Sequence, residues 1–437
     1  MSNPEPTLAQ RLKMVADLRL LARERFGLGN DHLVMRHLHR IEIYWEESLL
    51  GQVQTCLKRL DAERAKIERI GDRVPPHDTF LSGDLPVGEA PTPQGIATPV
   101  LLDNTCLLHG MLIAGLRGAG KTTLSRLLLR LITHIYPWVR ILLFDPNKSY
   151  KEFCDDPSWV NIDWDETKFN PLCAPIGFPY ERWITTQVDA LSRGELLHSR
   201  YLIQQRLARL ITAAHLPKYD DGKCRPPSLY DLRDDLANRR ERPGSREEAY
   251  RQSALNLIAG RLTTTGTVYD CSRGMEDALT KTRVRVATDN LSPRESREYY
   301  MTHIIQYSYS RLSLEPLLNP PELRSLVVVE ESQTLLEKHG DNLALYQELL
   351  LKSRPLGQGY LFVAQDLNDI DPLIFAAMGS YIIFAQSSGT NKKFARDLLD
   401  LSPAETSLLG RLHIGECFVK LAGHPIWPFP FIMKVTP

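Results

Sequence analysis

A glycine-rich segment is the clearest chemical signal in this sequence. Gly115 to Thr122 read GLRGAGKT, which fits G-x-x-x-x-G-K-[ST], between the apolar run GMLIAG and the amphipathic pattern TTLSRLLLRLITHI. Glycines at these positions let the backbone turn tightly, so that its N–H groups and a helix N-terminus face phosphate groups. We therefore expect a nucleotide to be bound by seven residues, namely Gly115, Gly118, Ala119, Gly120, Lys121, Thr122 and Thr123.

Two residues of this segment have separate predicted roles. Lys121 would reach the β- and γ-phosphates, and the hydroxyl of Thr122 would bind Mg²⁺. The segment therefore predicts ATP and Mg²⁺ as ligands. The alternative is a glycine-rich strand-to-helix turn without a ligand. The apolar run and the helical pattern that flank the segment are the context that the nucleotide motif requires, and they favour the nucleotide site.

A pair of carboxylates follows another apolar run. Glu330 and Glu331 come directly after LRSLVVV. Hydrolysis of a metal-bound nucleotide needs one carboxylate for the water shell of the metal and another to polarise the attacking water. We assign Glu330 to Mg²⁺ through water and Glu331 to water activation. A solvated loop beyond a buried strand is the alternative, but two charges there are costly unless metal or water compensates them.

Two further residues could act on the γ-phosphate. Gln365 ends the apolar run YLFVAQ and is a candidate sensor of that phosphate. Arg354, in LKSRPLGQGY, could reach the ATP of an adjacent subunit and stabilise transition-state charge as an arginine finger. A polar strand terminus and a surface arginine are the alternatives at these positions.

The elements that would position these residues alternate in type. Short β-branched runs (VRILLFD, VRVAT, SLVVVEE, GYLFVAQ and SYIIFAQ) alternate with helical patterns, which predicts an α/β fold with a mostly parallel sheet. Residues 1–72 show helical periodicity and predict an N-terminal helical arm. Residues 73–99 are rich in Pro and Gly and predict a linker. Residues 100–437 form the expected core domain, with a helical insertion at about 180–280.

Composition limits the protein class. The chain has 437 residues, of which 43% are hydrophobic, so it can bury a full core. Lys and Arg total 53, and so do Asp and Glu; DNA contact would therefore need a local patch or a ring of subunits. The seven cysteines form no CxxC pair, and the sequence lacks a signal peptide and an uninterrupted membrane-spanning run. We expect a soluble, cytoplasmic protein with reduced thiols.

The order of these motifs resembles the HerA/FtsK superfamily of ring-forming P-loop ATPases, in particular its HerA-like and conjugation-related branches. His109 stands just ahead of the P-loop strand, as in the family. ILLFDPNKSY, with its acidic Asp145, resembles the family's second strand, and FNPL resembles an element after it. VVVEES resembles the second carboxylate motif, with Glu-Glu in place of the commoner Asp-Glu. SRPLGQGYLFVAQ resembles the arginine-bearing segment and the sensor strand.

The resemblance implies a RecA-like core, assembly into a hexamer, translocation along double-stranded DNA, and a nuclease or defence effector as partner. The chain departs from the family at its start, where a charged helical arm replaces the β-barrel of HerA proteins and the membrane helices of coupling proteins. The predicted function is therefore that of an ATP-hydrolysing DNA translocase. Its alternative is an ATP-dependent oligomeric scaffold that recruits an effector without sustained translocation.

Overall fold

The computed structural model describes most of the chain, in the following stretches: residues 7–25, 33–70, 83–91, 97–192, 197–292, 294–319, 321–336, 343–422 and 430–436. The chain forms two compact units. The first comprises Met1–Cys106, Ala114–Leu127 and Gly379–Pro437. The second comprises Leu107–Ile113 and Leu128–Met378.

The strands of the first unit pair in antiparallel fashion. In the order of their pairing they are β2 (Ala97–Leu102), β1 (Leu85–Pro91), β11 (Phe431–Val435), β10 (Glu416–Lys420) and β9 (Ser380–Phe384). Gly88 lies opposite Val435, and Cys417 lies opposite Met433. Strands distant in the sequence are thus joined side by side.

Strand β1 and the beginning of β2 lie within the predicted linker of residues 73–99. Within that stretch, residues 73–82 and 92–96 lie outside the described part of the chain. The prolines and glycines suggested an irregular segment, but Pro86 and Gly88 flank a register shift between β1 and β2. Pro91 ends β1. Proline is tolerated at bulges and strand ends because no ladder hydrogen bond is required of it there.

The N-terminal helices have a hydrophobic core of their own. They are α1 (Leu8–Leu20), a π-helical continuation (Leu21–Arg25), α2 (Leu33–Tyr44) and α3 (Glu47–Ile70). Thr7 caps α1 by accepting from the backbone N–H of Gln10. The core residues are Val15, Ala22, Val34, Met35, Leu38, Ile41, Val53 and Leu57. Burial of this apolar stripe stabilises the arm more than helix propensity does.

The second unit contains the parallel strands. Their order is β3 (Met111–Ala114), β8 (Gln358–Ala364), β7 (Ser325–Val329), β4 (Arg140–Asp145), β6 (Arg283–Ala287) and β5 (Val160–Asp163). The pairs β7–β8, β4–β7, β4–β6 and β5–β6 are all parallel. All residues of β7 and β8 are buried, as expected for strands covered on both faces. The carboxyl ends of β8, β7, β4, β6 and β5 therefore lie at the same end of the sheet, where ligands of open α/β sheets bind.

Helices accompany these strands in both units. They are α4 (Asn104–Leu108), α5 (Lys121–Ile135), α12 (Arg294–Leu312), α13 (Leu343–Ser353), α14 (Pro372–Ala377), α15 (Gly389–Leu399) and α16 (Pro403–Leu408). Two 3₁₀ helices span Ser332–Thr334 and Arg354–Leu356. Within the described residues, no helix is both long and apolar enough to cross a bilayer.

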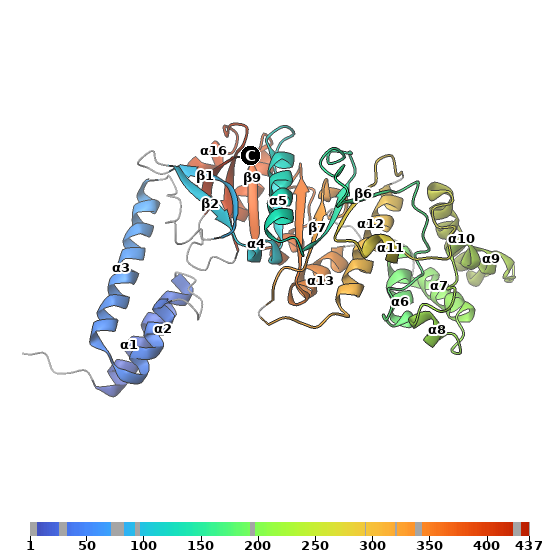
Figure 1. Ribbon diagram of the computed structural model, residues 1–437, viewed down its shortest axis with the longest axis horizontal. Helices are drawn as coiled ribbons and strands as arrows, with labels where there is room; N and C mark the ends of the chain where they lie inside the picture. Colours follow the sequence, from blue (N-terminus) through green and yellow to red (C-terminus); the bar gives the residue numbers. More distant parts are fainter. Residues whose placement is uncertain are drawn as a thin grey trace, which may run out of the picture. The chain divides into compact units, whose positions relative to one another are not determined.

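A run of helices separates β5 from β6, over the residues where an insertion was expected (Figure 1). They are α6 (Tyr180–Leu191), α7 (Leu197–Leu210), α8 (Leu216–Asp220), α9 (Leu229–Asn238), α10 (Arg246–Thr265) and α11 (Glu276–Leu279). His303 of α12 joins them to the sheet domain: it stacks on Phe169 at 5.0 Å between ring centroids, and its Nδ1 lies 2.9 Å from Oε1 of Gln187 on α6. The insertion is therefore anchored through an aromatic core.

Candidate functional site

The glycine-rich segment forms the turn between β3 and α5. Gly115, Gly118 and Gly120 have φ angles of 156°, 79° and 116°, which L side chains rarely adopt. A Cβ atom on Gly115 would lie 2.6 Å from Cβ of Phe384 on β9. Only glycine fits there, because the backbone of the turn packs directly on the neighbouring strand.

Further backbone hydrogen bonds hold this turn in place. The N–H of Leu116 donates to Ala385 O at 3.0 Å, and the N–H of Gly415 donates to Ala119 O at 3.0 Å. Both partners lie beside strands of the first unit, β9 and β10. The turn is thus fixed before any ligand binds, which reduces the entropic cost of binding.

Lys121 and Thr122 open helix α5, where the helix dipole favours anions. The Lys121 side chain is only 8% exposed, and its Nζ donates to Gly115 O at 2.7 Å and to Leu116 O at 2.9 Å. Thr122 is half-buried and Thr123 is exposed. This arrangement places a cation, a hydroxyl and a helix N-terminus within one short segment, and together they suit a polyphosphate.

The predicted carboxylates follow β7 in the second unit. Glu330 is 8% exposed, and its Oε1 accepts a short hydrogen bond from the hydroxyl of Tyr150. The N–H of Glu330 donates to Phe144 O at 3.2 Å, which continues the pairing of β7 with β4. Glu330 is therefore a buried carboxyl group with a specific hydrogen-bond donor.

Glu331 has an unusual backbone conformation and two side-chain donors. Its φ and ψ angles are 52° and 43°, in the left-handed region. Its Oε1 accepts from Nδ2 of Asn147 at 2.6 Å and from Nε2 of Gln365 at 3.3 Å. Left-handed conformations of non-glycine residues cost on the order of 1 kcal/mol and concentrate at functional sites. The structure thus brings the side chains of Glu331 and Gln365 into hydrogen-bond contact.

Asp145 fixes the loop that follows β4. Its carboxylate is fully buried and accepts from the N–H of Ser149 at 2.8 Å, the N–H of Tyr150 at 3.0 Å and Nε of Arg285 at 2.8 Å. Arg285, on β6, is 2% exposed. The ion pair therefore ties the start of the loop 145–150 to the middle of the neighbouring strand β6.

Arg354 lies away from these carboxylates. It is exposed in the 3₁₀ helix that precedes β8, whereas Gln365 follows β8. A strand of seven residues separates them, which corresponds to roughly 20 Å at about 3.3 Å per residue. Partial burial and the nearby Arg354 guanidinium lower the pKa of His109, so His109 lies near Arg354. Arg354 is therefore too distant to contact the Glu331 side chain of its own chain.

Sequence analysis missed Tyr150, Asn147 and Arg285. The first two lie in DPNKSY, directly after the acidic end of a predicted strand, and that position was the available signal. The P-loop residues belong to the first unit, whereas Glu330, Glu331, Gln365 and Arg354 belong to the second. Among the described residues, no three or more His, Cys, Asp or Glu side chains form a metal-binding group.

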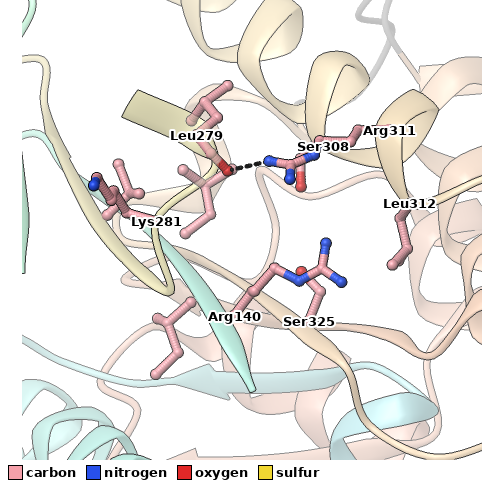
Figure 2. A pocket seen from close by; sticks show the side chains of 10 residues that line it. Arg140, Leu279, Lys281, Ser308, Arg311, Leu312 and Ser325 are labelled. Atoms are coloured by element: carbon pink, nitrogen blue, oxygen red, sulfur yellow. Dashed lines mark hydrogen bonds between the residues drawn. The ribbon is translucent and has the colours of Figure 1, made fainter. Parts of the chain in front are cut away.

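A small pocket lies at the amino ends of β4 and β7, opposite to the ends that carry the carboxylates (Figure 2). Its cationic side chains are Arg140, Lys281 and Arg311. Arg311 donates to Leu279 O at 2.9 Å, and both arginines also have acidic partners, Glu315 for Arg140 and Glu276 for Arg311. Because the charges of both arginines are compensated, we do not favour this pocket over the carboxyl ends of the strands as the candidate site.

Comparison with known proteins reveals likeness of fold at low sequence identity. No protein-family model and no curated protein matches the chain. The solved structure of VirB4 from Thermoanaerobacter pseudethanolicus covers 82% of this chain and 97% of its own, with a TM-score of 0.63 and 18% identity. The conjugative coupling protein TrwBdeltaN70 covers 82% and 90%, with a TM-score of 0.58 and 13% identity. TrwB in complex with ADP and Mg²⁺ covers 77% and 87%, with a TM-score of 0.56 and 15% identity. These likenesses confirm the predicted α/β fold with a RecA-like P-loop core.

Proposed function

We propose that this chain is an ATP-hydrolysing motor of the HerA/FtsK type. The observation that carries the proposal is the P-loop: three glycines in conformations that other residues rarely adopt, followed by a buried lysine at the start of a helix. The fold likeness to VirB4 and TrwB supports the same conclusion.

ATP and Mg²⁺ are the proposed ligands. Lys121 and the N–H groups at the start of α5 would bind the phosphates. The hydroxyl of Thr122 would bind Mg²⁺, and Glu330 would hold it through a water of its shell, because Mg²⁺ prefers oxygen ligands and usually keeps several waters. TrwB itself has been solved with ADP and Mg²⁺ and with the ATP analogue ADPNP.

The remaining residues would have separate roles in hydrolysis. Glu331 would orient and deprotonate the attacking water, and the amide donors of Asn147 and Gln365 would hold its carboxylate in place. Gln365 would also sense the γ-phosphate. Arg354, at the far end of β8, would act on the nucleotide of a neighbouring protomer.

Assembly and substrate follow from these roles. An arginine that acts in another protomer requires contact between protomers. We propose a ring-shaped homo-oligomer, a hexamer, that translocates double-stranded DNA. A nuclease or defence effector would be its partner. Because the chain has no net charge, we expect DNA contact to depend on residues that the ring brings together.

The deciding experiment compares ATP hydrolysis with and without double-stranded DNA, while the mass in solution is followed. A motor should assemble with ATP and be stimulated severalfold by DNA. An ATPase rate that DNA leaves unchanged, in rings shown to form, would favour the scaffold instead. A wild-type protein that neither binds nor hydrolyses ATP would overturn the proposal.

A further inference from the structure

We propose that Tyr150 is a positioning residue for Glu330, and that the buried pair of Asp145 and Arg285 holds Tyr150 in place. This inference rests on the proposed function, because it concerns the carboxylate assigned to Mg²⁺. Tyr150 itself would touch neither metal nor nucleotide.

The first step is the contact between the hydroxyl and the carboxylate. Tyr150 is fully buried, and its hydroxyl donates to Oε1 of Glu330. Such a donor fixes the rotation of the carboxylate about its last bond. Hydrogen bonds of this kind orient metal-binding groups, and they are stronger when the acceptor is charged.

The second step concerns the loop that carries Tyr150. Residues 145–150 leave the end of β4 and return to the end of β7, where Glu330 lies. The Asp145 carboxylate accepts from two N–H groups of this loop, those of Ser149 and Tyr150. The backbone of Tyr150 is therefore hydrogen-bonded directly to Asp145, the residue that ends β4.

The third step explains why a buried arginine is present. Asp145 is fully buried, and an isolated carboxylate there would be very costly. Arg285 compensates this charge through a hydrogen bond of 2.8 Å from its Nε to the Asp145 carboxylate. The Nη2 atom of Arg285 is buried and has no hydrogen-bond partner among the described atoms. Buried ion pairs are weak contributors to stability but can define one conformation. We infer that this pair is retained because it defines the position of the loop.

The test removes one oxygen atom, in Tyr150→Phe. The matched control is Tyr360→Phe, because Tyr360 is also a buried tyrosine of the same unit, and its hydroxyl accepts from Nε2 of Gln358 at 2.7 Å within β8. The readout without turnover is the affinity for Mn²⁺ in the presence of ADP, measured by electron paramagnetic resonance. The readout with turnover is the Mg²⁺ concentration at half-maximal ATPase rate.

We expect Tyr150→Phe to weaken Mn²⁺ binding about tenfold, as loss of a hydrogen bond to a metal-binding group does elsewhere. The Mg²⁺ concentration at half-maximal rate should rise by a similar factor, while the KM for ATP at saturating Mg²⁺ stays unchanged. Tyr360→Phe should match the wild type in all three quantities. Circular dichroism and thermal unfolding check that both variants are folded.

A second variant changes the loop without altering Glu330 or Tyr150. Arg285→Lys keeps the charge opposite Asp145 but loses the geometry of the guanidinium. It should weaken Mn²⁺ binding in the same direction, and in combination with Tyr150→Phe the loss should be less than the product of the two single effects. If Tyr150→Phe does not fold, the Mn²⁺ affinity of Arg285→Lys decides whether the loop positions Glu330.

The outcomes separate the two proposals. Wild-type metal affinity in a folded Tyr150→Phe protein, or equal losses in Tyr150→Phe and Tyr360→Phe, would overturn the role of Tyr150 and leave the ATPase proposal intact. A wild-type protein that binds neither ADP nor Mn²⁺ and does not hydrolyse ATP would overturn both.

Discussion

Asn147 donates its side-chain amide to Oε1 of Glu331 at 2.6 Å, so the loop after β4 holds the carboxylate that follows β7. Gln365 donates to the same oxygen at 3.3 Å from the end of β8. Three strand ends therefore converge on one carboxylate. If Glu331 is the base that we propose, these donors would orient it before substrate arrives, as efficient proton transfer requires.

Replacement of that carboxylate should separate binding from hydrolysis. In Glu331→Gln, the amide keeps the shape of the side chain but cannot accept a proton from water. We expect ATP binding to be retained and the hydrolysis rate to fall by orders of magnitude, by about 100-fold or more. Fluorescent-nucleotide binding and steady-state phosphate release measure the two quantities. If Glu330→Gln abolished hydrolysis and Glu331→Gln did not, the two assigned roles would be exchanged.

Replacement of the P-loop lysine should act earlier, on the nucleotide itself. Lys121→Ala removes the compact charge that would face the phosphates and the bonds to Gly115 O and Leu116 O. We expect ATP binding or turnover to be lost, as measured by isothermal titration and phosphate release. Lys393→Ala, at an exposed position of α15, is the control. Unchanged steady-state hydrolysis in Lys121→Ala would rule out the P-loop assignment.

The position of Arg354 at the far end of β8 leads to a mixing experiment. We expect Arg354→Ala to bind ATP but to hydrolyse it slowly, and its mixture with Glu331→Gln protein to recover some activity. In mixed rings, one protomer's intact Glu331 can meet another protomer's intact Arg354. Lys352→Ala, in the preceding turn, is the control.

ATPase rates across mixing ratios, with mass followed in solution, measure this rescue. Suppose that mixed rings form and that their activity never exceeds the sum of the separate variants. Arg354 then does not act between protomers, and another arginine, such as the exposed Arg411, becomes the candidate.

Acid should destabilise the insertion through His303. Burial lowers the pKa of His303 to about 3, whereas an unfolded histidine titrates near 6.5. The folded state therefore binds fewer protons, and the free energy of unfolding falls as pH falls from about 6.5 towards 3. Between pH 6.5 and 5 the expected loss from this residue is roughly 2 kcal/mol.

Urea unfolding across this pH range measures the effect. His303→Asn should be less stable at neutral pH but should lose less stability on acidification than the wild type. The control is His198→Asn, because His198 is exposed and stacks on Tyr250 with ring centroids 4.4 Å apart. Parallel pH profiles of the wild type and His303→Asn would contradict this assignment.

The sequence predicted the parts of the fold that depend on local pattern. The apolar runs at β7 and β8 mark strands because both faces of a parallel sheet are covered, and the P-loop motif lies between β3 and α5 as expected. Strand β1 was missed because Pro86 and Gly88 weaken the strand pattern, although a register shift accommodates them. Its partner β11 lies far along the chain, so no local signal could supply the pairing.

The site was predictable to the same extent. Glu330 and Glu331 could be found because they end an apolar run. Tyr150 and Asn147 could not, because their contacts depend on the parallel pairing of β4 with β7, which only tertiary structure establishes. The left-handed conformation of Glu331 was also unpredictable, since glutamate has no local preference for it.

The place of β11 between β1 and β10 has a consequence for biosynthesis. Strands β1 and β2 leave the ribosome before the second unit, but the partner on the other side of β1 is made only after it. Until Phe431–Val435 emerge, β1 presents an unpaired edge that can recruit another strand. Contacts of such long sequence separation also form slowly. The first unit therefore completes its sheet only after translation of the second, and during that interval the unpaired edge of β1 favours aggregation of the nascent chain.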